Sequence, residues 1–122
     1  MTGYYHLDVS QRDDAIIVRF KGRRRLVVAR VVYGVGRELG ELASGQDDRT
    51  LILDFAGVAD LSNVMLGVLV MLRKKTAAER RPLVLCGLGP KVRRFLNASL
   101  LSQLFEIRET AAEAASTLAH AS

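Results

Sequence analysis

The chain has 122 residues, 49% of them hydrophobic and 25% charged. A chain of this length and composition can bury one core but is too short for two ordinary domains. Its single cysteine, Cys86, excludes an intramolecular disulfide and favours a reducing compartment, and its longest apolar run, residues 64–72, is far shorter than the roughly 20 residues that span a bilayer. The net charge of +5 would suit nucleic acid, but the basic clusters have little aromatic interleaving, so acidic protein surfaces fit at least as well. We therefore expect one soluble, cytoplasmic domain over residues 1–122, without a cleaved leader, a transmembrane segment or a nucleic-acid partner.

The first part of the chain predicts a hairpin followed by a helix. Two short segments, residues 6–10 and 15–20, flank a polar turn, and the second is rich in β-branched residues. Residues 29–43 then carry apolar side chains at a helical period and end at a Ser-Gly pair, although three internal glycines weaken this helix. We expect an antiparallel hairpin and then an amphipathic helix.

The rest of the chain alternates strands with helices. Strands are predicted over residues 51–55, 82–86 and 104–107, and helices over residues 64–79, 91–97 (after Pro90) and 110–119 (capped by Thr110). Such alternation after a hairpin indicates an α/β fold with a mixed sheet of about five strands, the later ones parallel, packed with about four helices. Binding sites in such sheets lie beyond the carboxyl ends of the strands, where we expect the loop at residues 56–62.

An apolar strand passes through this loop directly into a helix. Ser62 and Asn63 favour a helix start, and either side chain can cap the helix by accepting a backbone N–H. The first turns that follow are apolar around nearly their whole circumference, which is more than one face against a sheet buries. We expect part of this surface to be exposed as a docking site, with Met65 as its leading contact because a thioether adapts to a partner. The alternative is that the rest of the chain covers it.

Three segments of the chain resemble the STAS domain family, whose best-studied members are bacterial anti-sigma factor antagonists. They are LILDFAGVADLSNVMLGVLVML, LVLCGLGPKVRRFLNAS and LLSQLFEIRETAAEAAS, similar in order and spacing to the strand, loop and switch helix of the family, to its next strand and helix, and to its tail. The resemblance covers nearly the whole chain. It implies a STAS fold and a non-enzymatic protein that binds an anti-sigma factor or another serine-kinase-type ATPase domain.

The resemblance also aligns the loop with a phosphorylation motif of the family, Asp-Ser-Ser/Thr-Gly-Leu-Gly. Leu66 and Gly67 match the closing Leu-Gly, whereas Ser62 stands in the place of the aspartate and Asn63 in the place of the phosphorylated serine. An amide neither accepts a phosphoryl group nor carries charge, so the usual switch is missing. Phosphorylation at Ser62 remains as an alternative to its reading as a structural cap.

Two functions fit these observations. The first is an anti-sigma factor antagonist-like module, a monomer or weak homodimer, that docks a partner through the loop and helix at residues 58–72. The second is a structural STAS subunit of a signalling scaffold or of a lipid-transport ATPase complex. The predicted partner-binding residues are Asp60, Ser62, Asn63, Val64, Met65, Leu66 and Leu69.

Catalysis, cofactors and metals are not expected. The glycine pairs of the chain lack a dinucleotide fingerprint, and His6 and His120 have no cysteine or clustered carboxylates at ligand spacing. Cys86 lacks an activating partner, and Asp54 and Asp60 have no histidine or nucleophile in sequence reach. We expect Asp54 to bond the loop backbone at the end of its strand.

Overall fold

The computed structural model describes residues 3–22, 25–45 and 49–121, and side chains as far as residue 116. The side chain of His120, considered above as a metal ligand, and Arg23 and Arg24 of the first basic cluster lie outside the described residues. In chain order the elements are β1 (Leu7–Arg12), β2 (Ala15–Phe20), β3 (Arg25–Leu26), α1 (Ala29–Ala43), β4 (Thr50–Asp54), β5 (Asp60–Leu61), α2 (Asn63–Ala78), β6 (Leu83–Cys86), α3 (Pro90–Ala98), the 3₁₀ turn η1 (Leu101–Leu104), β7 (Glu106–Arg108) and α4 (Ala111–Ala121).

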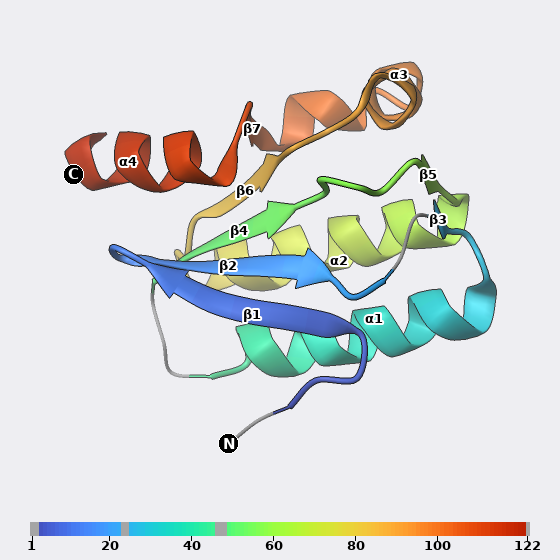
Figure 1. Ribbon diagram of the computed structural model, residues 1–122, viewed down its shortest axis with the longest axis horizontal. Helices are drawn as coiled ribbons and strands as arrows, with labels where there is room; N and C mark the ends of the chain where they lie inside the picture. The colour runs from blue at the N-terminus through green and yellow to red at the C-terminus, as the bar shows by residue number, and fades with distance from the viewer. Residues whose placement is uncertain (1–2, 23–24, 46–48, 122) are drawn as a thin grey trace.

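Five strands form a central sheet in the order β1-β2-β4-β6-β7 (Figure 1). The first pair is antiparallel, with Leu7 opposite Phe20, and the later strands are parallel. This confirms the predicted mixed α/β sheet. A separate parallel pair, β3 with β5, joins Leu26 to Leu61 and was not predicted, because a two-residue strand is too short to show a period.

Strand β4 is buried on both faces. Its alternate residues Leu51 and Leu53 belong to the large core beside α1 and α2, whereas Ile52 belongs to a smaller core beneath α4. Figure 1 shows α1 and α2 together on one side of the sheet and α4 on the other. Because both faces are covered, the strand reads as a continuous apolar run rather than as an alternating one.

Most element boundaries agree with the sequence analysis. Helix α1 coincides with the predicted range, and α4 begins at the predicted cap, where the Thr110 hydroxyl accepts the N–H of Glu113 at 3.1 Å. Two strands differ from their predicted ranges. The first continues to Arg12, two residues beyond the predicted 6–10, and the last is displaced. It was predicted over residues 104–107 but forms at Glu106–Arg108, because the preceding leucines turn into the 3₁₀ segment η1.

Helix α1 holds the N-terminal segment through a buried glutamate. The carboxylate of Glu38, only 5% exposed, accepts the backbone N–H of His6 at 2.9 Å and that of Tyr5 at 3.1 Å. The imidazole of His6 then lies against Gly34, where a Cβ would overlap it. At Gly40, in contrast, a Cβ would meet no described atom within 4 Å. Two glycines in one helix therefore have opposite environments.

This contrast predicts opposite effects for the same substitution. Gly40→Ala should raise the free energy of unfolding by about 0.5–1 kcal/mol, since alanine favours the helix and the methyl group enters open space. Gly34→Ala should lower it, because the buried ring of His6 must move. Urea denaturation of both variants measures the two changes, and a shift of both midpoints in the same direction would contradict this packing.

Candidate functional site

The corner between β5 and α2 is fixed by a capping serine. The Ser62 hydroxyl accepts the backbone N–H of Met65 at 3.3 Å, which is the N-cap geometry predicted above. The backbone N–H of Ser62 donates to the Leu26 carbonyl oxygen at 3.0 Å, so β3 ties the same residue from the other side. Ser62 is half-buried, and its hydroxyl is already engaged in this capping hydrogen bond.

The carboxylate of Asp60 joins three elements at this corner. Its Oδ2 lies 3.3 Å from Lys91 Nζ at the start of α3 and 3.5 Å from an Arg25 guanidinium nitrogen on β3. Partial desolvation acts to raise the pKa of Asp60, but the hydrogen bond and charge of Lys91 and the charge of Arg25 outweigh it, so the pKa lies below its usual value. Sequence reasoning did not find these two basic partners, because they are more than 30 residues away along the chain.

Two side chains at the start of α2 face solvent. Asn63 and Val64 are both exposed, the valine at 36%, directly after the capping serine. They stand next to the network around Asp60, so an amide, an apolar side chain and a partly paired carboxylate lie within five consecutive residues.

The sequence model of the STAS domain family matches residues 6–114. The chain belongs to the STAS domain family. This confirms the resemblance drawn from the three sequence segments.

Solved structures share the architecture of this STAS domain. An anti-sigma factor antagonist (STAS) domain protein from Planctomyces limnophilus is 18% identical, with 91% of this chain and 95% of that chain covered and a TM-score of 0.81. An anti-sigma factor antagonist from Mycobacterium paratuberculosis is 21% identical, with 91% of each chain covered and a TM-score of 0.76. The Bacillus cell fate determinant SpoIIAA in its phosphorylated form is 14% identical, with 92% and 98% covered and a TM-score of 0.68. At these identities the likeness establishes the fold.

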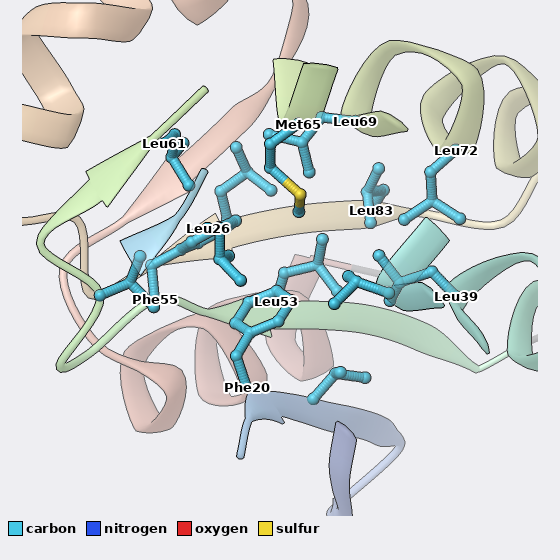
Figure 2. Packing of buried hydrophobic residues seen from close by; sticks show 14 of the residues in the cluster. Phe20, Leu26, Leu39, Leu53, Phe55, Leu61, Met65, Leu69, Leu72 and Leu83 are labelled. Carbon is cyan, nitrogen blue, oxygen red and sulfur yellow. The ribbon is translucent and has the colours of Figure 1, made fainter. Parts of the chain in front are cut away.

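The buried face of α2 in this STAS domain overturns one expectation. Met65 and Leu69 are 0% exposed and Leu66 is 6% exposed, so the predicted exposure of Met65 is wrong. Figure 2 shows Met65 and Leu69 within the core, in the same cluster as Leu26 and Leu83. The reason is that α2 packs both on the sheet and against α1, which together cover more of its circumference than one sheet face would. The three residues can support a partner site only by holding the helix in place.

The same substitution at Met65 and at its neighbour Val64 should therefore have very different effects on stability. Met65→Asp should lower the free energy of unfolding by at least about 3 kcal/mol, because it places an unpaired carboxylate in the core. Val64→Asp should change it by no more than about 1 kcal/mol, because an exposed carboxylate in the first turn interacts favourably with the helix dipole. Thermal unfolding followed by circular dichroism compares the two variants. A stable, folded Met65→Asp protein would show that this side chain is not sealed in the core.

Asp54 and Cys86 hold the base of the loop. Asp54 Oδ1 accepts the N–H of Ala56 at 3.0 Å, as predicted, and its Oδ2 accepts from Arg19 Nε at 2.9 Å. Desolvation, reinforced by the charge of Asp54, raises the pKa of the Cys86 thiol to about 12. A thiol that stays protonated is a poor nucleophile, and the Asp54 carboxylate is already bonded to the loop backbone and to Arg19.

Within the described part of the chain, no three or more histidine, cysteine, aspartate or glutamate side chains gather closely enough to hold a metal ion. No helix in residues 3–22, 25–45 and 49–121 is both long and apolar enough to cross a membrane.

Proposed function

We propose that this STAS domain is a non-enzymatic regulatory module of the anti-sigma factor antagonist type. It binds an anti-sigma factor, or a related serine-kinase-type ATPase domain, through the loop at residues 56–62 and the first turn of α2. The observation that supports this most directly is the exposed pair Asn63 and Val64 on a rigid corner. Solved neighbours of the same fold are anti-sigma factor antagonists.

The corner is suited to binding because little ordering remains to be done. The cap at Ser62, the β3–β5 pair and the network around Asp60 fix its backbone before a partner arrives. A preorganised surface loses less conformational entropy on association than a flexible loop does. In this proposal Asp60, Asn63 and Val64 contact the partner, and Met65, Leu66 and Leu69 act from the core by anchoring α2.

In this proposal the module lacks the usual phosphorylation switch. SpoIIAA shows that a protein of this fold can carry a phosphate. In this chain Asn63 occupies the position matched to the phosphorylated serine, and the neighbouring Ser62 hydroxyl accepts a backbone hydrogen bond. The module is then controlled by its abundance or by its partner rather than by its own modification. The free, buried Cys86 agrees with a cytoplasmic location, where thiols stay reduced.

Partner capture by two charge-matched variants tests the binding surface. Val64→Asp should lower partner affinity by about tenfold or more, because it places a carboxylate in the apolar part of the contact. Ala112→Asp adds the same charge at an exposed position of α4, across the sheet, and should leave affinity unchanged. The wild-type protein and both variants are used to capture proteins from a lysate of the native cell, and the bound proteins are identified by mass spectrometry.

The expected captured protein contains a histidine-kinase-like ATPase domain. Capture of a membrane transporter ATPase would instead favour the structural-subunit alternative and contradict the regulatory one. Equal capture by the wild type and by Val64→Asp would remove the corner from the interface.

Restoring a hydroxyl at the matched position tests the missing switch. Asn63→Ser should gain the mass of one phosphate when incubated with the captured partner and ATP, while the wild-type protein gains none. Intact-mass spectrometry measures the change, and the double variant Asn63→Ser with Ser62→Ala identifies the modified residue. Phosphate on the wild-type protein, located at Ser62, would contradict the loss of the switch.

A further inference from the structure

An open groove runs between α1 and α2, away from the corner described above. It encloses about 500 Å³ and is largely apolar. Both helices connect parallel strands of one sheet, so they run in the same direction (Figure 1). The residues that line the groove come from about two turns of each helix. We call it the α1–α2 groove, and its lining residues are Tyr33, Gly36, Leu39, Gly40, Val68, Met71, Leu72 and Lys75.

We propose that the α1–α2 groove binds an acidic amphipathic helix of the protein partner. This inference rests on the proposed function and extends it, because it gives the partner a second point of contact and states its chemistry. The apolar face of the guest helix would lie on the groove, and its carboxylates would meet the basic margins.

The large apolar side chains at the margins are unusually exposed. Tyr33 on α1 is 65% exposed and Met71 on α2 is 72% exposed, and the two line opposite sides of the groove. An aromatic ring and an adaptable thioether are side chains that protein interfaces favour. Neither is needed to close the core, which the residues beneath them already fill.

Gly40 leaves open space along the groove, although a glycine lowers the stability of helix α1. Gly40 lines the groove, yet no described atom lies within 4 Å of the position that a Cβ would occupy there. A glycine inside a helix costs about 1 kcal/mol relative to alanine, and packing within the described chain does not require this one. Its effect is to let the backbone of a guest approach α1 closely.

Positive charge follows both margins. On α2, Lys75 lines the groove one turn after Met71. On α1, Arg30 lies three residues before Tyr33 and Arg37 four residues after it, on the same stripe of the helix. These three side chains are exposed, and none makes an ion pair with a described residue. This unpaired charge on two sides of an apolar groove is complementary to an apolar stripe flanked by aspartate or glutamate.

The shape of the groove favours a helix over a small molecule. Small-molecule sites enclose most of their ligand, whereas this groove is open along one side. An amphipathic helix needs only one face covered, and helix-in-groove recognition has this form. Val68 at the groove lies one turn after Val64 on α2, so a single partner can contact the corner and the groove together.

Two synthetic helical peptides test the charge and the shape without the natural partner. Each is about four turns long with leucines at positions i, i+3, i+4 and i+7, flanked by glutamates in one peptide and by lysines in the other. Fluorescence anisotropy with the full chain should show the glutamate peptide binding at least about tenfold more tightly, with its affinity falling as salt is added. Equal binding of the two peptides would overturn the proposal.

Variants of the groove then locate the binding. Gly40→Leu places a side chain in the open space and Lys75→Glu reverses the charge of one margin, and each should weaken the glutamate peptide by about tenfold. Arg94→Glu makes the same reversal at an exposed position of α3 and should weaken it far less. Unchanged binding by both groove variants would overturn the proposal.

A second copy of the chain is the competing occupant. Sedimentation of the wild-type protein that shows a dimer, abolished by Gly40→Leu, would assign the groove to self-association and overturn the proposal. Since the peptide assay contains no natural partner, its failure leaves the capture result for Val64→Asp unaffected. The groove and the proposed function can therefore fail separately.

Discussion

The seating of α2 in the core determines which parts of this domain another protein can reach. Met65 and Leu69 are sealed between the sheet and α1, and this fixes both the rotation of the helix and the position of its first turn. Close-packed interiors do not deform gradually, so the helix cannot turn to offer a different face. What remains outside is set by this anchoring: Asn63 and Val64 at the start of the helix, and Met71 further along the same side.

The corner before α2 combines tertiary and local support. The serine cap is local, whereas the β3–β5 pair and the basic partners of Asp60 arrive from distant parts of the chain. A surface held from several elements keeps its shape when a partner binds, and specificity then depends on which side chains it presents. Under the proposed function, Asn63 at the position matched to the family's phosphorylated serine gives that surface an amide in place of a hydroxyl, on the same frame.

Sequence reasoning succeeded where the pattern reflects burial by neighbouring elements. The continuous apolar run of β4, the hairpin and the full range of α1 were predicted, because sheet faces and helix stripes impose periods of two and 3.6 residues. It failed for Met65, because a period cannot tell how many elements cover a helix. The groove was also missed: Gly40 read only as a weak point in α1, and its open surroundings depend on the packing of two helices.

The network around Asp60 is asymmetric in charge. One carboxylate brings two cations, Arg25 and Lys91, to the same point from separate elements. If either cation were lost, an attractive pair would survive. If the carboxylate were lost, both cations would lose their shared partner and turn toward solvent, because their side chains are 68% and 66% exposed. The side-chain link between β3 and α3 therefore depends on the one acid more than on either of the two bases.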